Sequence, residues 1–174
     1  GFLLEGITGS GKTEVYLRLA QAAIKKGKRV IVLVPEIALT RHMTEVFKRR
    51  IAGVAVLHSG LTPGERGRLW TAISRGEVPL VLGTRLAVFA PLPELGLIII
   101  DEEQENTFKQ EESPRYHARE VARKRLELEG GLLLLGSATP SLESYHRAVS
   151  GQIGLLHLPE RPGQARLPLI EVED

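Results

Sequence analysis

The residues with the clearest chemical potential lie near the start of the chain. Residues 6–13 read GITGSGKT and fit the pattern G-x-x-x-x-G-K-[ST] between an expected strand and an expected helix. Such a loop points backbone N–H groups at phosphate oxygens, while its lysine reaches the β- and γ-phosphates and its threonine binds Mg²⁺. The alternative is a glycine-rich turn with a chance lysine. The expected phosphate-binding residues are Gly6, Thr8, Gly9, Ser10, Gly11, Lys12 and Thr13.

A second group of candidate residues follows the apolar run 97–100, which leads directly into Asp101 and Glu102. Ligands of open α/β sheets bind at the carboxyl ends of strands. We therefore expect Asp101 to hold Mg²⁺ and Glu102 to orient or deprotonate an attacking water. With Lys12, these carboxylates form the expected catalytic set, and they suit hydrolysis of a bound nucleotide better than phosphoryl transfer to a hydroxyl substrate. The alternative is a solvated acidic loop.

Short apolar runs alternate with amphipathic stretches, which predicts how these residues are positioned. The expected strands cover residues 2–5, 30–34, 54–57, 80–82, 97–101 and 132–135. The expected helices cover residues 12–26, 62–75 and 139–149, the second opened by a capping box at residues 62–65. Continuous apolar strands alternating with helices predict an α/β fold, with a mostly parallel, doubly wound sheet and helices on both faces.

Composition sets limits on the class of protein. With 174 residues, 43% of them hydrophobic and 25% charged, the chain suits one globular domain. It has no apolar stretch that approaches a membrane span, so no membrane partner is expected. Cysteine is absent and the five histidines lack metal-ligand spacing, so we expect no zinc site and a reducing compartment. The net charge of +2 is a mild indication of a polyanionic partner.

Composition changes after Ser150, where several prolines occur close together. We expect a domain over residues 1–158 and a linker over residues 159–174. The opening directly into an apolar run suggests an internal piece of a longer protein.

Other segments bring a family resemblance. The sequence DEEQ at residues 101–104 resembles the D-E-x-H/Q box of superfamily 2 helicases, and GSATPS at residues 136–141 resembles their S-A-T motif. Residues 34–40 and 83–85 resemble the segments of that superfamily that touch the nucleic-acid backbone. The resemblance becomes specific to the PriA family of bacterial replication-restart helicases, and it spans essentially the whole chain. The segments that carry it are residues 6–16, 33–40, 57–66, 83–92, 108–119 and 136–144.

The resemblance implies the first, ATP-binding, RecA-like lobe of a 3′-to-5′ DNA helicase or translocase that acts in replication restart and primosome assembly in the bacterial cytoplasm. It implies single-stranded and forked DNA as partners and, through the parent chain, primosome proteins and single-stranded-DNA-binding proteins. In that family, the loop corresponding to residues 108–119 senses single-stranded DNA and signals to the ATP site. The residues expected to contact DNA or couple it to hydrolysis are Pro35, Thr40, Thr84, Arg85, Gln104, Phe108, Lys109, Arg115, Tyr116, Arg119, Ser137 and Thr139.

Several of these residues also have structural interpretations. Phe108 and Tyr116 either stack on bases or pack their loop onto the domain. Arg119 either meets phosphate or lies on a solvated helix face. Pro35 and Thr40 equally suit a loop and a helix cap.

Gln104 is a departure, because the family usually has histidine at this position. It leaves a second hypothesis open, a hydrolysis-poor DNA-binding scaffold for primosome assembly that retains its nucleotide site. We also expect this chain alone to hydrolyse ATP weakly, because an arginine finger from a second lobe can contribute about 10³–10⁵ in rate.

Overall fold

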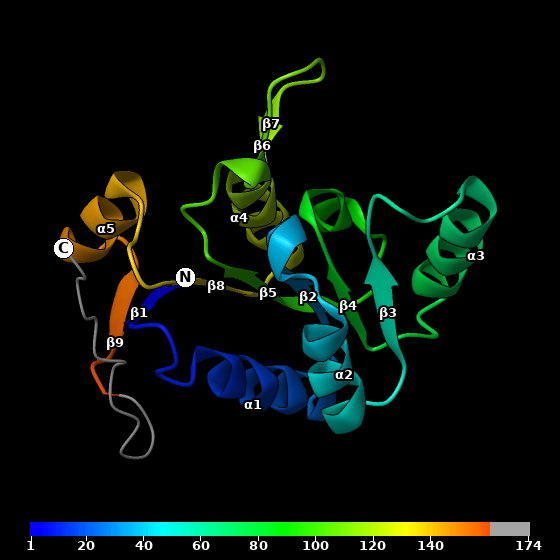
Figure 1. Ribbon diagram of the computed structural model, residues 1–174, viewed down its shortest axis with the longest axis horizontal. Helices are drawn as coiled ribbons and strands as arrows, with labels where there is room; N and C mark the ends of the chain where they lie inside the picture. The colour runs from blue at the N-terminus through cyan, green and yellow to red at the C-terminus, as the bar shows by residue number, and fades with distance from the viewer. Residues whose placement is uncertain (161–174) are drawn as a thin grey trace, which may run out of the picture.

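The computed structural model describes residues 1–160, and the linker expected over residues 159–174 lies almost wholly outside this range (Figure 1). Its main feature is a seven-stranded sheet in the order β3-β4-β2-β5-β8-β1-β9. Every adjacent pair is parallel, which confirms the expected fold class. The strands are β1 (Phe2–Gly6), β2 (Arg29–Leu33), β3 (Val54–Leu57), β4 (Leu80–Gly83), β5 (Leu95–Asp101), β8 (Leu132–Ser137) and β9 (Gly154–Leu158).

Over residues 1–160, five α-helices cover the two faces of the sheet (Figure 1). They are α1 (Lys12–Lys25), α2 (Arg41–Arg50), α3 (Pro63–Ser74), α4 (Ala118–Glu129) and α5 (Leu142–Val149). Tyr16 of α1 and Phe47 of α2 pack into one apolar cluster, whereas Ile73, Ala122 and Ala148 of the other three helices pack into a second. The sheet therefore separates two cores, as a doubly wound fold requires.

The central strands are buried on both faces. Along β2, Val30 and Val32 belong to one core, while Ile31 and Leu33 belong to the other. Successive strand residues point to opposite faces, so a strand covered on both sides needs an unbroken apolar run. The sequence pattern at residues 30–34 predicted this burial.

Two helix starts differ in how well the sequence predicted them. At α3 the capping box is present, since Thr62 Oγ accepts from Glu65 N at 3.3 Å and Glu65 Oε2 accepts from Thr62 N at 2.9 Å. The expected start of a helix at residues 139–140 is wrong. α5 begins at Leu142, because Ser141 is its N-cap and its backbone N–H is held by the Glu103 carboxylate at 2.7 Å.

Two further features were not predicted. β9 forms an edge of the sheet by pairing with β1, in a region expected to show only a composition change. A small antiparallel hairpin of β6 (Lys109–Gln110) and β7 (Tyr116–His117) projects beyond α4 (Figure 1). Three 3₁₀ turns complete the described chain: η1 (Glu36–Ala38), η2 (Arg85–Phe89) and η3 (Asn106–Phe108). Among the described residues, no helix combines the length and apolarity needed to cross a membrane.

The strand order brings the candidate residues together. β8 lies between β5 and β1, with Asp101 opposite Gly136 and Glu5 opposite Ser137. The ends of these three strands carry the acidic box, the S-A-T-like segment and the phosphate loop. They meet at one edge of the sheet because parallel strands share the direction of their carboxyl ends.

Candidate nucleotide-binding and hydrolysis site

The loop between β1 and α1 has the backbone of a phosphate cradle. Gly9 and Gly11 have φ values of 80° and 93°, a left-handed conformation that glycine adopts without a steric penalty. A Cβ at Gly6 would lie only 2.6 Å from Ser10 Oγ. Gly11 is the N-cap of α1 and supplies no side-chain cap, so the first N–H groups of the helix are left for an anion.

Two polar side chains of this loop are buried in a way that suits a ligand. Lys12 is 8% exposed, and its Nζ donates to Gly6 O at 2.7 Å. Among the described residues, the buried Ser10 Oγ has no hydrogen-bond partner. A buried hydroxyl without a partner is costly unless something satisfies it, which a phosphate oxygen would do. Thr8 and Gly9 are exposed at the loop surface, and Thr13 is half-buried in the first turn of α1.

The Asp101 carboxylate is held beside this loop by a residue that the sequence reasoning missed. Tyr16 Oη donates to Asp101 Oδ1 at 2.8 Å. Burial raises the pKa of Asp101, while the Tyr16 hydrogen bond and the Lys12 ammonium oppose that shift. Burial and the adjacent carboxylate raise the pKa of Tyr16, so Tyr16 stays a donor. Its spacing could have identified Tyr16 as a site residue, because it lies one helical turn after Lys12 on the same face of α1.

Glu102 stands at the opening of the site. Its Oε1 lies 3.8 Å from Lys12 Nζ, so the candidate base and the candidate phosphate ligand border the same space. Its φ of 48° is unusual for a residue with a side chain. Strained backbone of this kind clusters at functional sites, where the surrounding structure holds it in place.

A chain of hydrogen bonds joins Glu102 to the S-A-T-like segment. Gln104 Nε2 donates to Glu102 Oε2 at 3.0 Å, and Ser137 Oγ donates to Gln104 Oε1 at 2.6 Å. The backbone N–H of Thr139 in turn donates to Ser137 Oγ at 2.9 Å. Gln104 therefore uses one donor and one acceptor to connect β5 with β8, a link that matches the fixed polarity of an amide.

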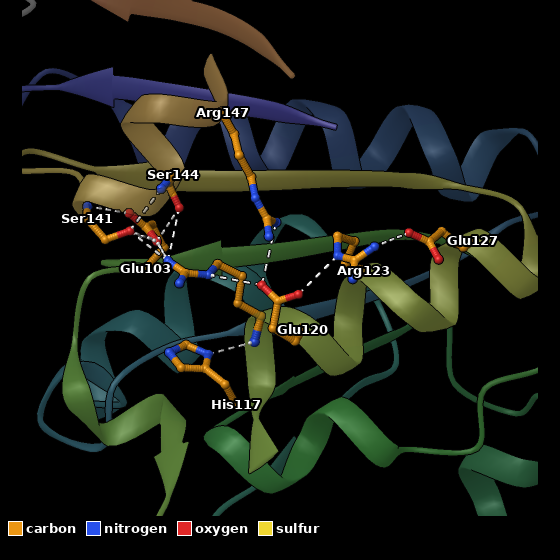
Figure 2. Close-up of polar contacts among 9 residues, drawn as sticks. Glu103, His117, Glu120, Arg123, Glu127, Ser141, Ser144 and Arg147 are labelled. Carbon is orange, nitrogen blue, oxygen red and sulfur yellow. Dashed lines mark hydrogen bonds and ion pairs between the residues drawn. The ribbon is translucent and has the colours of Figure 1, made fainter. Parts of the chain in front are cut away.

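Glu103 is the centre of a buried polar cluster that the sequence did not predict (Figure 2). Its carboxylate is fully buried and accepts from Arg119 Nη1 at 2.6 Å and from Ser144 Oγ at 2.8 Å. It also accepts from the backbone N–H of Ser141 at 2.7 Å and from its hydroxyl at 3.0 Å. One carboxylate thus ties the acidic box to the starts of both α4 and α5.

This cluster corrects both interpretations of Arg119. Its side chain is only 11% exposed, and its guanidinium donates to Glu103, Ser141 and Ser144. It therefore neither lies on a solvated face nor presents a free cation to phosphate. Glu120, which follows it, makes more exposed ion pairs with Arg123 and Arg147.

The expectation that Phe108 contacts DNA is also wrong, and the alternative, that it packs its loop onto the domain, is confirmed. It is 1% exposed and belongs to the core under α4, so its ring packs the loop onto the domain and is not available to stack on bases. Sequence alone did not distinguish these interpretations, because an aromatic residue suits both.

Of the other expected residues in the hairpin region, Lys109 and Arg115 are exposed, whereas Tyr116 is half-buried and its hydroxyl is fully buried. Tyr116 is half-buried, with its ring edge-on to Phe89 at 5.0 Å between centroids and the Arg85 guanidinium 5.9 Å from its centroid. Arg85 also donates to Lys109 O at 2.6 Å. The exposed Lys109 and Arg115 contact the side chain and the backbone carbonyl of Glu111, respectively.

The remaining expected DNA contacts follow strand ends on the same edge of the sheet. Pro35 is buried after β2. Thr40 is exposed and caps α2, accepting from Met43 N at 3.2 Å. Thr84 is 7% exposed between β4 and η2. The cap role of Thr40 is thus present, and a cap does not prevent an exposed hydroxyl from contacting DNA.

Comparison with known proteins places this arrangement in a class. Residues 1–148 match the family described as DEAD/DEAH box helicase, and the chain belongs to that family. The helicase domain of Hef from Pyrococcus furiosus has a similar fold, with a TM-score of 0.67 and 21% identity over 93% of this chain and 35% of that one. RecG bound to a three-way DNA junction gives a TM-score of 0.66 and 26% identity over 94% of this chain and 21% of that one.

Curated relatives narrow the resemblance to replication restart protein PriA. The chain is 54% identical to PriA of Bacillus subtilis over 99% of this chain and 22% of the relative. It is 51% identical to PriA of Synechocystis over 99% of this chain and 21% of the relative. The chain therefore spans about a fifth of the length of these relatives.

Proposed function

We propose that this chain is the ATP-binding lobe of a longer DNA helicase or translocase that acts 3′-to-5′ in replication restart and primosome assembly. The observation that carries the proposal is the hydrogen-bond chain from Glu102 through Gln104 to Ser137. It joins a candidate catalytic carboxylate beside a phosphate loop to the segment that, in this family, connects hydrolysis with DNA. Resemblance to PriA along nearly the whole chain supports the biological role.

The residues present fit ATP and Mg²⁺. The unpartnered Ser10 hydroxyl, the uncapped start of α1 and the buried Lys12 ammonium are suited to phosphate oxygens. Thr13 and Asp101 supply oxygen ligands of the kind that Mg²⁺ prefers. When bound, Mg²⁺ neutralises charge on the phosphates during hydrolysis. Lys12 binds phosphate, and Glu102 orients the attacking water and takes up its proton.

DNA is proposed to lie along the strand ends that carry Pro35, Thr40, Thr84 and Arg85, and to reach the hairpin through Lys109, Arg115 and Tyr116. Arg119 and Gln104 act as positioning residues between the hairpin and the ATP site. Ser137 and Thr139 connect this region with α5. Residues 1–158 form the lobe and residues 159–174 a linker to a second lobe of a longer bacterial cytoplasmic protein. Primosome and single-stranded-DNA-binding proteins are its expected partners.

An ATPase assay of the longer protein, with and without forked DNA, tests this function. We expect DNA to stimulate hydrolysis many-fold and Lys12→Ala to abolish it, because the variant lacks the β/γ-phosphate contact. Equal rates of ATP hydrolysis by the unmodified protein and Lys12→Ala in the presence of DNA would contradict the proposal. A length series of 3′- and 5′-tailed substrates then checks the polarity.

Gln104 supports a second candidate, the hydrolysis-poor scaffold. Glutamine cannot take up a proton as histidine can, and here its amide occupies one oxygen of Glu102. The same assay separates the two candidates. The scaffold predicts normal fork binding with hydrolysis no faster than that of Lys12→Ala.

A further inference from the structure

A small apolar pocket lies apart from the nucleotide site, where β3 and β4 end beside α3. It has a volume of about 230 Å³ and a mostly apolar lining. Two of its aromatic residues are unusually accessible, since Trp70 is 36% and Phe89 44% exposed. The residues that define its character are His58, Leu61, Arg66, Trp70, Leu86 and Phe89.

We propose that this pocket receives a single unstacked base of the bound DNA strand. The inference rests on the proposed function and adds a base-binding site to it. The volume lies below the about 300–1,000 Å³ typical of pockets for whole ligands, so one ring system suits it better than a complete nucleotide or a helix. Aromatic walls favour a base, because every base presents a π-face for stacking.

The charges around the pocket suit the phosphates on either side of such a base. Arg66 lines the pocket, and Arg85 lines a neighbouring hollow whose lining also includes Glu36. In the part of the chain that the structure describes, neither arginine has a carboxylate within ion-pair distance. An apolar cavity with one arginine in its lining and a second arginine in the adjoining hollow is a combination that suits single-stranded nucleic acid.

The pocket is also continuous with the proposed DNA path. Thr84 and Leu86 line both the pocket and the neighbouring hollow that contains Arg85. Phe89 forms a wall of the pocket, and its ring packs edge-on against the ring of Tyr116 in the hairpin, with 5.0 Å between the ring centroids. A base seated here would thus touch the same residues that connect the strand ends with the hairpin.

The test compares two oligonucleotides of equal length bound by the longer protein, one of thymidines and one with abasic sites. Both carry the same phosphates, but only the first offers bases. We expect Phe89→Leu and Trp70→Leu each to weaken binding of the thymidine strand by about 5- to 150-fold, the range for loss of one stacked base. Binding of the abasic strand should not change.

Tyr145→Leu is the matched control, because Tyr145 is also 44% exposed but lies on α5, away from the pocket. It should leave both affinities unchanged. The inference would be overturned if the pocket variants weakened binding of both strands equally. It would also be overturned if they changed neither affinity, the result expected when another part of the longer protein covers the pocket. Failure of the unmodified protein to bind either strand would instead overturn the proposed function, and the pocket with it.

Discussion

Three consecutive carboxylates at the end of β5 have three different environments. Asp101 is buried against the Tyr16 hydroxyl, Glu102 is half-buried beside Lys12, and Glu103 is fully enclosed by partners. Neighbouring residues of similar chemistry thus suit three tasks: holding a metal, handling a water molecule and fixing two helices. Environment decides their roles, since a carboxylate's behaviour depends on its burial and its partners.

Asp101→Asn should stabilise the folded protein at neutral pH. Burial raises the pKa of Asp101, so the folded protein binds its proton more tightly than the unfolded chain does. The contribution of Asp101 to stability is therefore present at acid pH, and it is lost as the pH rises through the pKa of Asp101 in the folded protein. We expect a gain in the free energy of unfolding at pH 7, within the range of about 0.5–2 kcal/mol common for single stabilising substitutions.

Denaturant unfolding at pH 7 and near pH 4 measures this effect. The gain in stability should shrink as the pH falls and Asp101 of the parent takes up its own proton, and the variant should lose ATP hydrolysis. A variant less stable than the parent at pH 7 would show that ionised Asp101 stabilises the fold.

Arg119→Met should be strongly destabilising, because it leaves the buried Glu103 carboxylate without its cation. Removing one partner of a buried pair costs about 3–5 kcal/mol. Arg123→Met is the control, since the Arg123 pairs with Glu120 and Glu127 are exposed and such pairs contribute about 0–1 kcal/mol. Denaturant unfolding of both variants gives the comparison.

A double variant strengthens that test. With Glu103→Gln added, no charge is left buried, so the total loss should be smaller than the sum of the two single losses. Additive losses would mean that Glu103 and Arg119 stabilise the protein independently.

At the scale of elements, close packing between α1 and β8 positions the site. A Cβ at Gly136 would overlap the Tyr16 hydroxyl that holds Asp101. Gly136 of the S-A-T-like segment therefore leaves room for the Tyr16 side chain, which orients the Asp101 carboxylate at the end of the neighbouring strand β5.

Gly136→Ala should accordingly displace Tyr16 and lower both stability and ATP hydrolysis. Overpacking of a core costs about 1–3 kcal/mol. Gly67→Ala offers a contrast, because nothing lies within 4 Å of a Cβ at that position of α3, and helix propensity predicts a gain of about 0.5–1 kcal/mol. Thermal unfolding and ATPase rates of the pair check this, and unchanged activity in Gly136→Ala would contradict the role given to Tyr16.

How far sequence predicts these elements depends on how local their causes are. The six expected strands are all present, because each is an apolar run bounded by turn residues. β9 was missed since its outer residues Leu156 and His157 are exposed at an edge, which weakens the burial pattern. The start of α5 was misplaced because a distant carboxylate, that of Glu103, fixes the preceding backbone.

The same distinction between local and distant contacts explains which parts of the candidate site could be predicted from the sequence. The phosphate loop could be predicted because its residues are contiguous, and its strand–turn–helix context is confirmed. The Glu103–Arg119 pair and the burial of Phe108 depend on contacts between segments far apart in sequence. Whether each expected residue binds nucleotide or DNA stays a prediction.

At the scale of the whole molecule, our proposal makes this chain one wall of an ATP site in a longer protein. It covers about a fifth of its PriA relatives, and helicase hydrolysis in our proposal depends on a second lobe. This wall carries the groups that we propose for phosphate, metal and water at one edge of the sheet. It also carries the hydrogen-bond chain that leads from them towards the proposed DNA path.

The most direct test of the central claim is to measure ATP hydrolysis and Mg-nucleotide binding side by side for Glu102→Gln in the longer protein. Loss of a general base lowers rates by about 10²–10⁴-fold without removing phosphate contacts. Our account predicts a fall of that size in DNA-stimulated hydrolysis, with nucleotide affinity retained. Hydrolysis at the parent's rate would contradict it, because the carboxylate beside Lys12 would then have no part in the reaction.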